Sequence, residues 1–260
     1  MQDLTVTLMQ SKLAWEQPGV NRAHFDELLA AMGRQTDLVV LPEMFTTGFT
    51  MNAAPLAETM DGPTQEWLRQ RAQKYGCALT GSVIIEENGR YFNRLFFALP
   101  DGALHWYDKR HLFRMAGEEK VYSAGDRRLV VEMKGWRICP FVCYDLRFPV
   151  WMRNMPDLNY DLIVIVANWP AKRAAHWNAL LPARAIENQS WLAAVNRVGA
   201  DGHGYDHAGD SAVYDPLGRE LWRRTNAEAV ASITLSHELL QTYRRDFPVW
   251  KDADRFELDQ

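Results

Sequence analysis

The sequence has few cysteines and no long hydrophobic run. Three cysteines among 260 residues are too few for a disulfide framework, so a reducing compartment is the simpler assumption. The start of the chain, MQDLTVTLMQSK, lacks the positively charged first segment and apolar core of a signal peptide. No stretch approaches the roughly 18 uninterrupted apolar residues that a membrane-spanning helix requires. We therefore expect a cytoplasmic protein without a membrane partner.

The chain also lacks an excess of positive charge. It carries 29 Lys and Arg against 33 Asp and Glu, a net charge of −4, and has no basic stripe that would attract a phosphate backbone. Nucleic acid is therefore not expected as a partner. No Ser-, Gly- or Pro-rich linker divides the 260 residues, which suffice for one large core. We predict a single domain over residues 1–260.

Short apolar runs bounded by Gly, Pro, Asn or Asp are frequent and indicate a large sheet content. They read LVVLPE, CALTGSVIIEE, RLFFALPDG, RLVVEM, RICPFVC, DLIVIVANWP, WLAAVNRVG, SAVYDPLG and AVASITL. Helical periodicity is present over residues 21–33, 62–76 and 175–189; Gly33 and Gly76 are placed to end the first two helices, and Pro182 to bend or divide the third. Strands this apolar need cover on both faces. The order predicts an α/β fold in which two mixed sheets stack between helix layers.

Polar side chains with catalytic potential stand at the ends of three apolar runs. Glu43 lies in VVLPEMFTTGF, Lys109 in HWYDKRHLF and Cys143 in CPFVCYDLRFP. Alone, such a Glu or Lys is usually a solvated residue, and a Cys in an apolar run is usually inert packing. Sites in sheets with parallel strands tend to form at the carboxyl ends of the strands, so we expect the three side chains to meet there.

Together these residues make a coherent acyl-transfer site. A thiol with a pKa of about 8.5 is mostly protonated near neutral pH, so a nucleophilic Cys143 needs a base or a nearby cation. Glu43 is the candidate base. Lys109 is the candidate cation, because a fixed positive charge in a site poor in water opposes the negative charge of a tetrahedral intermediate. Such a site needs neither histidine nor a metal.

Other signals suggest rival chemistry. The loop HGYDHAGD holds His203 and His207 close to Asp206 and Asp210, a composition that suits a divalent metal. It has no helical periodicity, so we expect an ordinary polar loop and no metal. No G-x-S-x-G motif is present, which leaves serine hydrolase chemistry without a nucleophile.

The segments LPEMFTTGF, YDKRHLF and CYDLRFP resemble, in order and separation, the three catalytic motifs of the nitrilase superfamily, the carbon–nitrogen hydrolases. The similarity continues through ANWPAKRAAHWNALLPARAIENQSWLAAVNRVG and HAGDSAVYDPLGREL, so it covers nearly the whole chain. YDKRHLFRMAGEE, CYDLRFPVWMRN and ANWPAKRAAHW are most similar to the ω-amidase branch, which cleaves the terminal amide of dicarboxylic acid monoamides such as 2-oxoglutaramate or 2-oxosuccinamate.

The resemblance implies a nitrilase-like, four-layer αββα sandwich, a homodimer or dimer-based oligomer, and no cofactor. It also implies residue roles. Glu43 would be the general base, Cys143 would form an acyl-thioester, and Lys109 with the backbone N–H of Tyr144 would hold the oxyanion. Many members have a further supporting glutamate, for which AGEEKVYSAG offers two candidates. Its spacing to Gly125 favours Glu118, and Glu119 stays open.

A substrate with a free carboxylate needs a cation in the pocket. Arg173 is the first candidate for it, followed by Arg147 and Lys172, although a structural pair of Arg147 with a nearby acid such as Asp145 is the favoured alternative for that residue. Phe45 is either a pocket residue or a core residue. Three alternatives remain open: another carbon–nitrogen substrate such as a nitrile, carbamoyl amine or aliphatic amide; a non-catalytic interaction protein; and a metal-dependent hydrolase using the His203 loop.

Overall fold

The computed structural model describes residues 2–33, 35–254 and 256–258, and its first sheet has six strands. β1, β2 and β3 run parallel, and β13, β4 and β5 pair antiparallel with their neighbours. The spatial order is β13 (Ala229–Leu235), β1 (Leu4–Gln10), β2 (Leu38–Val40), β3 (Ala78–Glu87), β4 (Arg90–Ala98) and β5 (Leu104–Asp108).

The second sheet has seven strands and the same mixed character. β7, β8 and β9 form its parallel centre, and the remaining strands pair antiparallel. The spatial order is β10 (Val198–Ala200), β11 (Asp206–Tyr214), β9 (Trp191–Asn196), β8 (Leu162–Ala167), β7 (Trp136–Val142) and β6 (Val131–Met133), with β12 (Glu220–Thr225) paired to β11.

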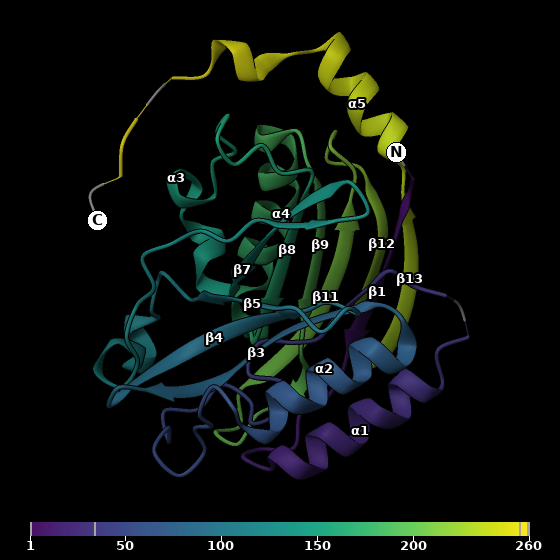
Figure 1. Ribbon diagram of the computed structural model, residues 1–260. Coiled ribbons are helices and arrows are strands. Elements are labelled where there is room, and N and C mark those ends of the chain that lie inside the picture. The colour runs from purple at the N-terminus through teal and green to yellow at the C-terminus, as the bar shows by residue number, and fades with distance from the viewer. Residues whose placement is uncertain (1, 34, 255, 259–260) are drawn as a thin grey trace.

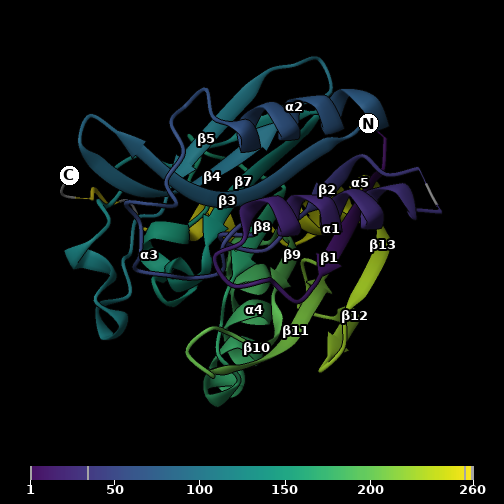
Figure 2. The same ribbon diagram turned by 90° about the horizontal axis from the view of Figure 1, so that it is seen from below.

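Helices cover the outer face of each sheet. Phe25 of α1 and Trp67 of α2 pack in one apolar cluster with side chains of the first sheet. Trp177 and Leu181 of α4 pack with the second sheet. Figure 1 shows α1 and α2 together on one side of the strands, and Figure 2 shows α2 and α4 on opposite sides. The predicted αββα sandwich is confirmed. The helices are α1 (Pro18–Ala30), α2 (Pro63–Tyr75), α3 (Pro149–Met152), α4 (Ala174–Asn188) and α5 (His237–Asp246).

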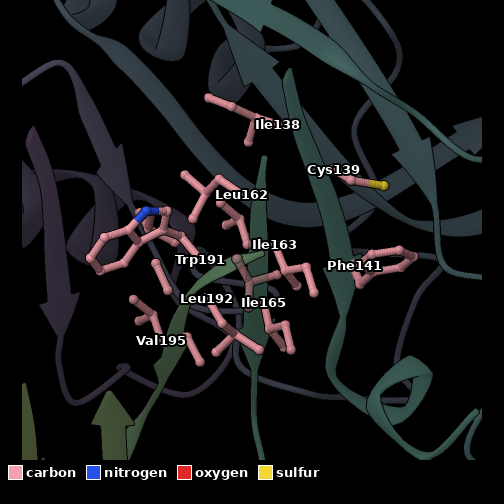
Figure 3. Packing of buried hydrophobic residues seen from close by; sticks show 14 of the residues in the cluster. Ile138, Cys139, Phe141, Leu162, Ile163, Ile165, Trp191, Leu192 and Val195 are labelled. Carbon is pink, nitrogen blue, oxygen red and sulfur yellow. The ribbon is translucent and has the colours of Figure 1, made fainter. Parts of the chain in front are cut away.

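The core between the sheets explains why the central strands are apolar on both faces. Each sheet meets helices on one side and the other sheet on the other, so neither face is left to water. Figure 3 shows the second sheet, where Ile163 of β8 is paired with Leu192 of β9, and Ile165 with Phe141 of β7. Cys139 is fully buried in this cluster.

Most predicted elements are present, with shifted ends. The first helix stops at Ala30, short of Gly33, whereas α2 ends at Gly76, whose left-handed backbone (φ 63°) suits glycine. The third helix keeps Pro182 inside it. The sequence analysis missed β1, β12, α3 and α5. Within the described residues no helix has the length and apolarity to cross a bilayer. The single domain over residues 1–260 stays a prediction.

The topology brings the candidate residues to one edge. β2 and β5 point the same way in the first sheet, because two antiparallel steps from β3 restore the direction. Glu43 follows β2 and Lys109 follows β5, so both lie where these strands end. In the second sheet Cys143 follows β7 and Asn168 follows the parallel strand β8. The four residues therefore come from strand ends of both sheets.

A close approach beside Glu43 gives a test of packing. A Cβ added to Gly81 of β3 would lie 2.9 Å from both Leu41 Cβ and Phe45 Cδ1, which flank Glu43 in the sequence. We expect Gly81→Ala to lower the free energy of unfolding by about 1–3 kcal/mol through overpacking, measured by denaturant unfolding. Gly19→Ala in α1 is the control, because its Cβ meets nothing within 4 Å. Equal stability of the two variants would contradict this account.

Candidate active site

The Glu43 carboxylate is fully buried in the loop after β2. Its Oε1 accepts hydrogen bonds from Lys109 Nζ at 2.9 Å and from Asn93 Nδ2 at 2.8 Å. Its Oε2 accepts one from the backbone N–H of Asn168 at 2.8 Å, and Asn168 Nδ2 donates to the Glu43 carbonyl oxygen at 2.5 Å. Buried carboxylates require such partners. Side chains and backbone from three other strand regions thus fix the orientation of this one carboxylate.

Lys109 is buried between two carboxylates. Its Nζ donates to Glu43 Oε1 at 2.9 Å and to both oxygens of Glu118, at 3.0 and 2.9 Å. It also lies 5.0 Å from the centre of the Phe49 ring, which adds a cation–π contact. Burial lowers the pKa of Lys109, but Glu118 and Glu43 outweigh it and the net pKa is raised. Lys109 is therefore a permanent cation.

Cys143 begins a 3-10 turn, residues 143–147, directly after β7. Its φ of 45° lies in the left-handed region, which is unusual for a residue other than glycine. Burial raises the pKa of the thiol well above its usual range; the charge of Glu43 and the hydrogen bond that the thiol makes with it raise it further, and Lys109 opposes them. The resting group is a thiol in contact with a potential proton acceptor. The N–H of Tyr144 is in the first turn, where N–H groups lack partners within the helix.

The structure separates the two candidate supporting glutamates. Glu118 is buried beside Lys109, and its Oε2 also accepts the backbone N–H of Phe113 at 2.5 Å. Burial and the nearby Glu43 raise the pKa of Glu118, and Lys109 lowers it, with a net rise. Glu119 makes no ion pair or hydrogen bond with Lys109 among the described residues. Glu118 is the one that contacts Lys109.

A pocket of about 520 Å³ opens over these residues. Cys143, with 9% of its surface exposed, is the member of the cluster that reaches furthest toward it, since Glu43 and Lys109 are 0% and 1% exposed. One part of the wall is aromatic and another part is cationic. The aromatic residues are Phe49, Phe113, Tyr144, Trp169 and Tyr205, and the cationic ones are Arg147, Lys172 and Arg173.

The pocket cations are held by contacts that leave their charges uncompensated. The Arg147 guanidinium lies 4.7 Å from the Trp169 ring centre, and its Nη2 is 2.9 Å from His176 Nδ1. Arg173 lies over the Phe113 ring at 5.2 Å, and Lys172 over an aromatic ring at 4.7 Å. Across the described part of the chain none of the three cations forms an ion pair with an acid. The expected alternative for Arg147, a pair with Asp145, is absent there.

Phe45 does not line the pocket. It packs in the core under the first sheet, edge-on to Phe25 with ring centres 5.5 Å apart and 5.8 Å from Trp67. Of the two places expected for Phe45, the structure shows the core, because the loop turns Glu43 toward Lys109 and Phe45 toward the helices. Phe49, four residues further on, takes the position at the pocket.

Several site residues were missed by the sequence analysis. Asn93 lies inside β4 and its sequence context gives no signal. Asn168 and Trp169 follow the apolar strand DLIVIVA, so the strand-end pattern that identified Cys143 would have found them.

The His203 segment forms part of the pocket wall, and the expectation of a loop over residues 203–210 is wrong for its second half, because Asp206–Tyr214 is strand β11. The His203 ring packs edge-on to Trp15 at 5.0 Å. His207 lies near the backbone oxygens of Gly199 and Tyr205, and burial lowers its pKa. Within residues 2–33, 35–254 and 256–258, no group of three or more His, Cys, Asp or Glu side chains is arranged to hold a metal ion.

Comparison with known proteins agrees with this geometry. The sequence profile described as Carbon-nitrogen hydrolase matches residues 5–245. The chain is 48% identical over 261 residues to Omega-amidase YafV of Escherichia coli strain K12, a match that covers 99% of this chain and 100% of that protein. It is 32% identical over 251 residues to the 2-oxoglutaramate amidase of Bacillus subtilis strain 168, covering 95% and 96% of the two chains.

A solved structure shows the same fold. The crystal structure of a CN-hydrolase superfamily protein from Xanthomonas campestris, which has an arsenic adduct in its active site, is 50% identical. It superposes with a TM-score of 0.97 over 100% of both chains. These matches confirm the family predicted from the three motifs and the prediction of a hydrolase that acts on carbon–nitrogen bonds other than peptide bonds. The chain belongs to the carbon-nitrogen hydrolase family.

Proposed function

We propose that the protein is an amidase that hydrolyses the terminal amide of a small dicarboxylic acid monoamide, of the 2-oxoglutaramate or 2-oxosuccinamate type, to the acid and ammonia. One observation carries the proposal: Cys143, Glu43 and Lys109 meet at the base of a pocket whose wall has three cations without acidic partners among the described residues. The names of the relatives, omega-amidase and 2-oxoglutaramate amidase, support the same activity.

The geometry supports acyl transfer in two steps. Glu43 accepts the thiol proton as Cys143 attacks the amide carbonyl carbon, and Lys109 with the N–H of Tyr144 stabilises the resulting oxyanion. Glu43 then gives the proton to the leaving nitrogen, the C–N bond breaks, and ammonia departs from an acyl-thioester. Water that has lost a proton to Glu43 attacks the thioester, which releases the acid and restores the thiol.

The pocket supports a carboxylate at the far end of the substrate. We assign Arg173, together with Arg147, to that group, because an arginine binds a carboxylate with two parallel hydrogen bonds. Phe49, Phe113 and Trp169 offer apolar surface for the methylene groups between the two ends. Glu118 acts on Lys109 and holds its ammonium toward the reacting carbonyl.

We also infer a homodimer that works in the cytoplasm without a cofactor. Val150 of α3 and Ile186 of α4, helices that follow strands β7 and β8 of the second sheet, leave 51% and 48% of their surfaces exposed. Large apolar side chains on an outer helix layer favour association of two copies. Sedimentation of the purified chain, with a mass of 29.9 kDa for the monomer, tests this inference.

The activity is tested with a panel of amides and nitriles, with ammonia release as the measurement. We expect hydrolysis of acid monoamides and a Cys143 acyl adduct by mass spectrometry, while Cys143→Ala stays folded and loses all turnover. Cys77→Ala is the control, since Cys77 is buried in the core, where burial raises its pKa to about 11. Preference for nitriles, carbamoyl amines or aliphatic amides would replace the proposed substrate; turnover by Cys143→Ala, or loss of activity to a chelator, would overturn the mechanism.

The carboxylate assignment predicts a substrate-dependent effect. Arg173→Ala should raise KM for 2-oxoglutaramate about tenfold or more, because a charge-assisted bond to the substrate is lost. KM for an uncharged amide of the same length should change less than twofold. Steady-state kinetics on both substrates provide the comparison, and Arg147→Ala shows how the two arginines share the group. An unchanged KM for the acid substrate in Arg173→Ala would show that this placement is wrong.

The two neighbouring glutamates form a matched pair. Glu118→Gln should lower kcat at least tenfold, because the ammonium of Lys109 loses one of its two carboxylate partners and shifts toward Glu43. Glu119→Gln should retain activity within about twofold, as it leaves the contacts of Lys109 intact. Ammonia release by both variants is measured at saturating substrate. Equal losses would contradict the role of Glu118.

A further inference from the structure

Behind Cys143, away from the pocket, lies a fully buried carboxylate that the mechanism does not use, that of Asp145. Its Oδ2 accepts hydrogen bonds from the backbone N–H of Val142 at 3.0 Å and from the Tyr107 hydroxyl at 2.8 Å. Its Oδ1 accepts the backbone N–H of His111 at 3.0 Å and lies 2.8 Å from His111 Nδ1. Four donors thus converge on one carboxylate.

These donors come from the two chain segments that carry the reacting groups. Val142 directly precedes Cys143, whereas Tyr107 and His111 stand two residues before and two residues after Lys109. Asp145 therefore links the turn that carries the thiol to the segment that carries the ammonium. The two segments belong to different sheets, since β5 and β7 lie in the first and the second.

The conformation of the turn depends on such a link. A left-handed φ of 45° at Cys143 is a strained conformation for a residue with a Cβ, and it persists only where surrounding bonds enforce it. The bond from Val142 N–H to Asp145 closes the turn around Cys143 from the inner side. Arg184 holds the far end, where its Nε and Nη2 donate to the Leu146 carbonyl oxygen at 3.0 and 2.8 Å.

The four contacts require an acceptor with no protons of its own. A carboxylate only accepts, so the proton on the His111 ring stands on Nδ1. Burial and the charge of Asp145 raise the pKa of Tyr107 well above its usual range, which keeps its hydroxyl a donor. The His111 ring is also fixed by stacking on Phe148, with ring centres 3.7 Å apart. An asparagine at position 145 would replace one acceptor oxygen by an NH2 group, whose two protons would face donors.

We propose that Asp145 is a positioning residue that sets the place of the Cys143 thiol relative to the Lys109 ammonium, by tying the strained turn to the segment 107–111. The inference rests on the proposed function of Cys143 and Lys109. Asp145 touches no substrate in this role. Its loss should affect the rate of the chemical step and leave substrate binding in the pocket as it was.

The test compares two buried carboxylates. Asp161 accepts the backbone N–H of Arg137 at 3.0 Å and Arg244 Nη1 at 2.7 Å, and it precedes β8 at the end away from Cys143. Asp161→Asn therefore controls for the loss of a buried carboxylate without a link to the site. Asp145→Asn should lower kcat for the amide found in the panel about tenfold or more and leave KM within about twofold. Asp161→Asn should lower the melting temperature with kcat retained.

A second variant keeps the test decisive if Asp145→Asn does not fold. His111→Phe preserves the stack on Phe148 and the backbone N–H, and removes only the ring donor to Asp145; it should lower kcat severalfold at constant KM. A kcat equal to that of the wild type in folded Asp145→Asn, or in His111→Phe, would overturn the inference. Absence of amide hydrolysis by the wild-type protein would instead overturn the proposed function, so the two failures are distinguishable.

Discussion

The site depends on the burial of the Lys109 ammonium between Glu43 and Glu118. Removing a charge from water costs several kcal/mol, and attraction between ions recovers it only where geometry and further hydrogen bonds are good. Here the remaining acceptor positions are met by Asn93, by Asn168 and by a backbone N–H. With two carboxylates and one ammonium, the cluster has an excess of negative charge when all three groups are ionised, and the surrounding N–H donors compensate it.

That excess adds to a larger effect of burial on the nucleophile. A thiol next to a lone cation would ionise readily, but burial raises the pKa of Cys143, and the charge of Glu43 raises it further. The thiol therefore holds its proton until a substrate is present and a base can receive it. Such a site keeps a buried cysteine unreactive at rest and limits its oxidation. The cluster that supplies the base for Cys143 thus also keeps its thiol protonated at rest.

The sequence predicted the three candidate catalytic residues better than it predicted the residues and strands that surround them. Apolar runs that turn polar at their ends identify Glu43, Lys109 and Cys143, because parallel strands place their ends together. The place of Phe45 stayed open, since alternation along an irregular loop does not show which way each side chain turns. β1 was missed although Thr5 and Thr7 alternate with buried aliphatic residues, because its place inside the sheet follows from pairing with β2 and β13, which is a non-local property.

Charge is distributed along the pocket in a direction that suits the proposed substrate. The base of the pocket has the buried acidic cluster, and Arg147, Lys172 and Arg173 stand on its wall without acidic partners among the described residues. A monoamide of a dicarboxylic acid is neutral at one end and negative at the other. The acidic cluster repels the carboxylate and accepts an amide, whose N–H groups are donors, while the cations attract the carboxylate. Reversed binding is therefore opposed at both ends, and orientation follows from electrostatics before any close contact forms.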